Sequence, residues 1–330
     1  MKKCMNDTDL FVDESLSGIL AAYRGFYETG GNDLRAVIHP PTDDKVIIVT
    51  GGGYGHLPLF LGYVGDGLCD GAAVGNIFTS PSCKTILNAT HALKPSKGVL
   101  YLFGNYFGDT MNFEMACEKL ESEGIPSQIV KMSDDVASAP RDMFEERRGV
   151  AGILFAYKIA GACAKQGKSL EEVVRITRKT VANTATFGVA FSSCMIPGQE
   201  KPIFDLDEED MEIGMGIHGE PGVRREKMKE STSIAQELCH AVTKDLSLME
   251  KDRVAVLVNG LGATSREELY IFYHDIEQIL AKEGLEISKV FVGEFATSME
   301  MSGLSLSLIR LDDELEYYLK ELAYTPFISF

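Results

Sequence analysis

Two histidines and one aspartate occupy positions where side chains of their type can do chemistry. His56 stands in the glycine-rich stretch "TGGGYGHLPLF", Asp109 closes the loop "LFGNYFGD", and His218 lies in "GMGIHGEPG". Each stretch follows a run of residues whose pattern predicts a strand, and open α/β sheets bind ligands at strand ends. The three residues lack the carboxylate density of a magnesium–nucleotide site and the third close ligand of a catalytic zinc site. The sequence predicts a small polar ligand site without a metal or cofactor.

The glycine-rich stretch does not fit the nucleotide-binding fingerprints. A G-x-G-x-x-G pattern started at Gly51 meets His56 at its third glycine, and one started at Gly53 meets Pro58. The Gly-Lys-Ser/Thr of a P-loop is absent. The glycines allow the backbone to approach a small ligand closely, and a plain tight turn is the alternative interpretation.

Structural alternatives exist for the other two residues as well. Asp109 opens a helical pattern and could serve only as its N-cap. Residues 220–222, Glu-Pro-Gly, suit a type II turn with proline and glycine in its central positions, but such a turn leaves His218 unexplained. The remaining histidines read as structural: His39, His91, His240 and His274.

The strand and helix patterns that surround these residues predict an α/β protein of two domains. Short β-branched runs alternate with helical patterns in the first part, which indicates a mostly parallel sheet flanked by helices. These strands are expected at 45–50, 98–103 and 127–132, and helices at 7–23, 81–93, 109–123, 149–166 and 169–181. Strands then dominate, at 184–191, 211–217, 253–259, 287–293 and 305–311, with helices at 231–245 and 266–283. We expect an N-terminal domain over residues 1–183 and a mixed α/β domain over 184–330.

Composition limits the classes of partner. The chain has 330 residues, 45% of them hydrophobic, and a formal net charge of −17. Such a charge argues against direct binding to nucleic acid or to an anionic membrane. The seven cysteines form no CxxC pair, and neither a signal peptide nor a long apolar span is visible. We expect a cytoplasmic protein.

Seven motifs, in order from residue 51 to residue 315, resemble those of the dihydroxyacetone kinase K subunit (DhaK) family. They are "GGGYGHLPLFLGYVGDG", "GNIFTSPS", "GNYFGDTMNFEMA", "RRGVAG", "GMGIHGEPG", "VNGLGAT" and "TSMEMSGLSLSLIRLDDEL". The resemblance implies a homodimer of two-domain α/β subunits. It also implies that His218 adds to the ketone of dihydroxyacetone as a covalent hemiaminal. His56 and Asp109 then hydrogen-bond the hydroxyls of the ligand, with Asp109 placed to take a proton, and backbone N–H groups near Gly53 complete the pocket.

The family's kinase subunits bind no ATP themselves, because a separate L subunit carries the nucleotide. Against the family pattern, Tyr54 stands in place of a serine, Leu57 in place of a glutamate and Gly104 in place of a lysine. Tyr54 and Gly104 therefore line an altered pocket in this interpretation. The departures favour a DhaQ-type coactivator, a non-enzymatic paralogue that binds dihydroxyacetone and works with a TetR-type transcription factor. The alternatives are a kinase subunit that partners the L subunit, and a kinase subunit for another short ketose or aldose.

Overall fold

The structure is a computed structural model that describes residues 2–329. The chain forms two compact units, and each is made of segments that are discontinuous in sequence. The first unit contains the residues up to 132, residues 156–179 and the residues from 317 onward; the second contains residues 133–155 and 180–316. This grouping differs from the expected division at 183/184 in three segments: residues 133–155 and 180–183 group with the second unit, and the C-terminal segment groups with the first.

The first unit is built on a six-stranded sheet with the order β1-β2-β4-β3-β5-β6. Strands β4, β3, β5 and β6 run parallel, whereas β2 pairs antiparallel with both β1 and β4. The strands are β1 (Glu28–Gly30), β2 (Asp33–Ile38), β3 (Ile47–Gly52), β4 (Gly71–Val74), β5 (Val99–Gly104) and β6 (Ser127–Met132). The mostly parallel sheet expected for the N-terminal part is confirmed.

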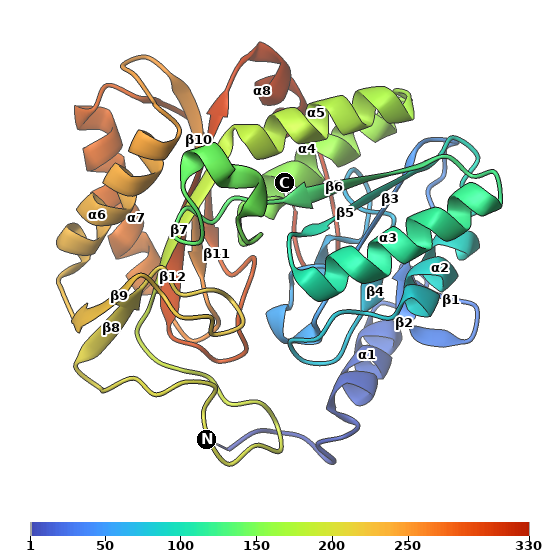
Figure 1. The fold of residues 1–330 in the computed structure, drawn as a ribbon, viewed down its shortest axis with the longest axis horizontal. Helices are drawn as coiled ribbons and strands as arrows, with labels where there is room; N and C mark the ends of the chain where they lie inside the picture. Colours follow the sequence, from blue (N-terminus) through green and yellow to red (C-terminus); the bar gives the residue numbers. More distant parts are fainter. Residues whose placement is uncertain (1, 330) are drawn as a thin grey trace. The chain divides into compact units, whose positions relative to one another are not determined.

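Helices cover both faces of this sheet. Successive side chains of a strand point to opposite faces, so both sets of side chains are buried. Val49 of β3 packs in the core formed with α2 and α3, which lie side by side in Figure 1. The next residue, Thr50, faces the other way and shares a hydrogen bond of 2.6 Å with the hydroxyl of Tyr157 in α4. The helices that contribute to the unit are α1 (Phe11–Ala22), α2 (Cys83–Ala92), α3 (Phe107–Ser122), α4 (Ile153–Lys165), α5 (Leu170–Ala182) and α8 (Asp313–Lys320).

The second unit has a mixed six-stranded sheet with the order β11-β10-β12-β7-β8-β9. Only the β10–β11 pair is parallel within this sheet. The strands are β7 (Thr184–Ala190), β8 (Asp210–Ile213), β9 (Arg224–Lys227), β10 (Arg253–Gly260), β11 (Glu286–Gly293) and β12 (Gly303–Leu311). The mixed α/β architecture expected for the second part is confirmed.

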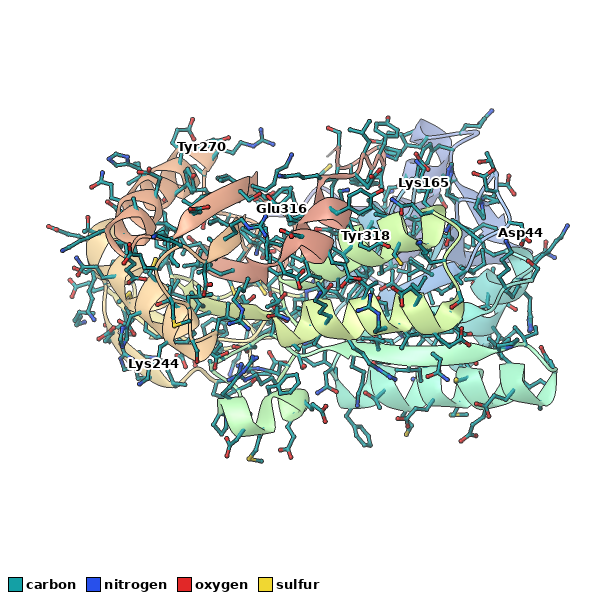
Figure 2. All side chains as sticks on the ribbon, turned by 90° about the horizontal axis from the view of Figure 1, so that it is seen from above. Asp44, Lys165, Lys244, Tyr270, Glu316 and Tyr318 are labelled. Carbon is teal, nitrogen blue, oxygen red and sulfur yellow. The ribbon has the colours of Figure 1, made fainter. Side chains whose placement is uncertain are left out.

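The two faces of this second sheet differ in polarity. Helices α6 (Ser231–Asp245) and α7 (Arg266–Lys282) pack together on one face, where Leu306 belongs to the apolar core. Figure 2 shows Lys244 and Tyr270 on this helical layer, and Tyr270 is 58% exposed. The opposite face carries buried polar side chains: the hydroxyl of Thr186 lies 2.7 Å from Ser307 and 2.5 Å from the carboxylate of Asp134. The alternation "SLSLIRL" in β12 thus separates a leucine face from a serine face.

The first helix begins later than its pattern indicated. Its N-cap is Leu10, so α1 starts at Phe11 and not at residue 7. Strands β1, β2, β4 and β9 have no counterpart among the expected elements. Within residues 2–329, no helix combines the length and apolar character that crossing a membrane would need.

Candidate functional site

The glycines after β3 are required by the packing of the protein itself. A Cβ on Gly52 would overlap the ring of Phe60, and one on Gly53 would lie 2.9 Å from the backbone of Phe78. A Cβ on Gly55 would lie 2.5 Å from the Phe78 ring. Real Cβ atoms do not approach other atoms so closely, so each position needs glycine. Packing within the protein therefore accounts for these glycines without a ligand, and it is a different explanation from the tight turn that the sequence suggested.

His56 ends the short 3₁₀ helix η1 (Tyr54–His56) and is fully buried. Its imidazole centroid lies 4.9 Å from that of Phe78 and 6.3 Å from that of Phe60. The glycines let these two aromatic residues close around the histidine, so the loop fixes the position of its ring.

Asp109 lies in the first turn of α3, two residues after the helix begins. The N-cap of this helix is Tyr106, so the expectation that Asp109 could be the cap is wrong. The carboxylate is buried at the positive end of the helix dipole, which stabilises its charge. Burial, together with smaller contributions that include the charge of Asp109, raises the pKa of Tyr157 well above its usual value.

The loop after β4 lies against His56 and against Gly108, the residue before Asp109. Its Phe78 packs on His56, and a Cβ on Gly108 would lie 2.5 Å from the hydroxyl oxygen of Ser80 in the same loop. The loops after β3, β4 and β5 leave the same edge of the sheet, because these neighbouring strands are parallel. The chain then continues from β3 to β4 on one side and from β5 to β6 on the other. Ligands of open α/β sheets bind at such switch points, and His56 and Asp109 both belong to this one.

Tyr54 lies in a core cluster, although the sequence interpretation assigned it to the pocket. Its ring packs with Val12 and Leu16 of α1, and its hydroxyl shares a 2.7 Å hydrogen bond with Ser15. Burial raises the pKa of Tyr54, against a smaller opposite effect of Ser15. Leu57 packs against the same cluster. Two of the departures from the family pattern thus pack in or against this core cluster, and Tyr54 does so beside α1.

Gly104 is the last residue of β5 and faces Met132 of β6 in the strand register. Its carbonyl accepts a hydrogen bond of 2.9 Å from the N–H of Tyr106. The position therefore supplies backbone to the loop before α3, but no side chain that could reach a ligand.

His218 belongs to the second unit and lies in a turn after β8. The N–H of Gly219 donates to the carbonyl of Gly216 at 3.0 Å, which places His218 in the centre of the turn. Gly219 has the positive φ of +81° that glycine tolerates best. Gly222 has no such φ, so the expected type II turn over residues 220–222 is wrong.

The imidazole of His218 is oriented by the carboxylate of Glu220. Nδ1 lies 3.0 Å from Oε1 of Glu220, and the backbone N–H of His218 donates to Oε2, also at 3.0 Å. Burial opposes the charge of Glu220, but the hydrogen bond and charge of His218, with Arg148 nearby, lower its pKa to about 2. An ionised carboxylate only accepts hydrogen bonds, so we assign a proton to Nδ1; in the neutral form of the imidazole this puts the ring lone pair on Nε2.

Glu220 is the contact of a candidate site residue that the sequence interpretation missed. Its Glu-Pro-Gly context resembles a common turn, and this resemblance hid the carboxylate two residues after the histidine. The available signal was the spacing itself, since a carboxylate at that distance within a turn can fold back on the histidine.

The predicted site residues are divided between the two units. Gly53, Tyr54, His56, Gly104 and Asp109 belong to the first unit, and His218 to the second. Across residues 2–329, no three His, Cys, Asp or Glu side chains form a group that could hold a metal ion. Three of the other histidines have structural partners: His39 with Phe26, His91 with Glu123, and His274 with Gln278.

Comparison with known proteins finds a matching family and relatives over nearly the whole chain. The Dak1 domain matches residues 17–327. The dihydroxyacetone-binding subunit DhaK of the PTS-dependent dihydroxyacetone kinase 2 of Listeria innocua is 41% identical over 331 residues, which cover 100% of this chain and 99% of that protein. D-erythrulose kinase of Mycolicibacterium smegmatis is 44% identical over 99% of this chain, which spans only 56% of that enzyme.

A solved structure extends the likeness to the fold. The dihydroxyacetone kinase operon co-activator Dha-DhaQ superposes with a TM-score of 0.87 at 34% identity, covering 94% of this chain and 96% of that one. Relatives named as kinases and a relative named as a co-activator thus share this architecture.

Proposed function

Because the chain belongs to the Dak1 domain family, we propose that it binds dihydroxyacetone through a covalent bond to His218. The observation that carries this proposal is the pairing of His218 Nδ1 with the carboxylate of Glu220. A neutral imidazole held in this way has its nucleophilic lone pair on Nε2. The name of the Listeria relative supports dihydroxyacetone as the ligand.

The proposed capture step balances without any further reagent. The lone pair on Nε2 of His218 forms a bond to the carbonyl carbon, and the π electrons of the C=O bond move to the oxygen. That oxygen takes a proton from water and becomes a hydroxyl. The ring, now positively charged, releases its Nδ1 proton to water, and the carboxylate of Glu220 stabilises the positive charge until then. The product is a hemiaminal that contains every atom of the ketose.

We propose further that this chain is the substrate-binding subunit of a short-chain hydroxyketone kinase. In this assignment Asp109 accepts the proton of the hydroxyl that attacks phosphorus, and His56 orients the ligand hydroxyls. A separate nucleotide-bearing L subunit supplies the phosphoryl group. The kinase names of the Listeria and Mycolicibacterium relatives support this role.

The packing of the two departing residues removes one argument against the kinase assignment. Tyr54 and Leu57 pack in or against the core cluster that includes Val12 and Leu16 of α1, so their difference from the family pattern does not by itself argue for lost phosphoryl transfer. The second candidate is the DhaQ-type coactivator that works with a TetR-type transcription factor. It is favoured by Gly104, which removes a cationic side chain from β5, and by the likeness to the Dha-DhaQ structure. In both roles we propose a cytoplasmic homodimer.

Intact-protein mass spectrometry under native conditions tests the capture. The wild-type protein should gain the full mass of one dihydroxyacetone, because a hemiaminal loses no water, whereas a lysine Schiff base would lose one. His218→Ala should abolish the gain, and His240→Ala, which removes an exposed histidine of α6, should retain it. An adduct that survives in His218→Ala would remove this residue from its role.

Reconstitution separates the kinase from the coactivator. The protein is mixed with an L subunit, a phosphoryl donor and either dihydroxyacetone or erythrulose, and the phosphorylated product is measured. Turnover at about 1–100 s⁻¹, typical of kinases, supports the kinase assignment. An adduct without turnover, combined with ligand-dependent binding to a TetR-type protein, would establish the coactivator instead.

A further inference from the structure

The charged side chains of Asp135, Arg148 and Glu220 form a series of contacts that ends at His218, and all of them belong to the second unit. Asp135 is joined to Arg148, Arg148 faces Glu220, and Glu220 holds His218. The contact between Arg148 Nη2 and Asp135 Oδ2 is 2.7 Å, and Nη1 lies 4.0 Å from Oε2 of Glu220. The exposed fraction of the side chain is 5% for Asp135 and 16% for Arg148. Asp135 and Arg148, which are the members of this series farther from His218, are therefore mostly buried, and only Glu220 contacts the imidazole.

Arg148 is fixed at its backbone as well as at its guanidinium. Its backbone N–H donates to the hydroxyl of Ser138 at 3.0 Å, and its carbonyl accepts from the N–H of Asp135 at 3.1 Å. The guanidinium also donates from Nη2 to the carbonyl of Gly214 at 3.1 Å. Arg148 thus joins the segment that follows β6 to the loop that carries His218.

Gly216 makes room for this junction. A Cβ at this position would overlap Oε2 of Glu220 and lie 2.7 Å from Nη1 of Arg148. Gly216 has no positive φ that would by itself require glycine. The absence of a side chain at position 216 is therefore explained by the approach of Arg148 to Glu220.

We propose that Arg148 is a positioning residue that holds the carboxylate of Glu220 against Nδ1 of His218 and so selects the tautomer that captures the ketone. A carboxylate that is 30% exposed has other rotamers open to it, and a fixed positive charge on its far side restricts it to one. The Asp135 carboxylate in turn fixes the guanidinium plane through Nε and Nη2. Histidines that bind metals are oriented in a similar way, by a hydrogen bond from the second ring nitrogen to a carboxylate or another acceptor. The inference rests on the capture proposed for His218.

The tautomer of His218 in the ligand-free protein tests the proposal directly. In protein with ¹⁵N-labelled histidine, the nitrogen shifts distinguish the Nδ1–H from the Nε2–H form. The wild-type protein should show His218 as Nδ1–H, and Arg148→Met should show a mixture of both forms. The rate of adduct formation with dihydroxyacetone should fall about 10- to 100-fold, as is usual when an outer-shell partner is removed. Arg148→Lys, which keeps the positive charge, should lie between the two.

Two further variants separate positioning from stability. Gly216→Ala leaves every charge in place but pushes the flexible ends of Glu220 and Arg148 apart, so it should reproduce the mixed tautomer in a folded protein. Arg253→Met removes an arginine of β10 that pairs with Asp313 and Glu316, and it should leave both the tautomer and the adduct rate unchanged.

The outcomes are distinguishable. A folded Arg148→Met or Gly216→Ala variant with the wild-type tautomer and adduct rate would overturn the role of Arg148. If the wild-type protein forms no adduct, the proposed capture fails, while the tautomer measurement still decides whether Arg148 positions the imidazole.

Discussion

Replacing Tyr54 by serine, the residue that the family pattern carries at this position, tests whether this side chain serves the core or the pocket. The ring is 7% exposed and packs with α1, so the substitution removes nearly a whole buried aromatic side chain. Large-to-small changes of this kind destabilise by about 3–5 kcal/mol. The lost hydrogen bond to Ser15 contributes about 0.5–1.5 kcal/mol within that total.

The matched variants divide this total into its two parts. Tyr54→Phe keeps the ring and loses only the hydroxyl, so it should cost about 1 kcal/mol. Ser15→Ala should cost a similar amount, and the double variant should cost less than the sum of the two single ones, because both remove the same bond.

The assay is urea unfolding of each variant, together with the native mass measurement of the dihydroxyacetone adduct. We expect Tyr54→Ser to lower the urea midpoint strongly and to leave the adduct of the folded fraction unchanged. A Tyr54→Ser variant that loses less than about 1 kcal/mol but changes adduct formation would refute the assignment of Tyr54 to the core.

Three other predictions follow from single contacts. The pKa of Glu220 is lowered from 4.5 to about 2, so the stability it contributes should be present above pH 4.5 and lost as the pH falls toward 2; Glu220→Gln should flatten the unfolding free energy over this acid range. Gly55→Ala forces a Cβ against the ring of Phe78 and should destabilise by about 1–3 kcal/mol, visible as a lower urea midpoint. Lys45→Met leaves the buried carboxylate of Asp70 without the ammonium that lies 2.6 Å from it, and should cost about 3–5 kcal/mol in thermal unfolding; an unchanged melting temperature would contradict the pairing.

Much of the fold could be predicted from local pattern. The β-branched run before the first glycine-rich loop predicted β3, and the run at residues 305–311 predicted β12. Strand β4 has the sequence "GAAV", which carries no β-branched run or alternation to reveal it. Its pairing with β2 and β3 depends on residues distant in sequence.

The candidate site was less accessible to sequence reasoning for two physical reasons. The direction of the Tyr54 side chain depends on α1, which is remote in sequence, so a loop residue that seemed to face a ligand turned out to face the core. Glu220 had a sufficient local explanation as part of a turn, which concealed its contact with His218. The sequence was enough to single out His56 and His218, whereas the residues that contact them could be identified only from the structure.

The bond between His218 and the ketose is the central claim, and nuclear magnetic resonance tests it most directly. Dihydroxyacetone labelled with ¹³C at the carbonyl carbon is added to protein that carries ¹⁵N-labelled histidine. We predict that the carbonyl signal is replaced by one of a tetrahedral carbon with a one-bond coupling to a histidine nitrogen, and that this signal is absent in His218→Ala. A bound ligand whose carbon keeps the ketone shift, or a tetrahedral carbon with no coupling to histidine nitrogen, would contradict the account.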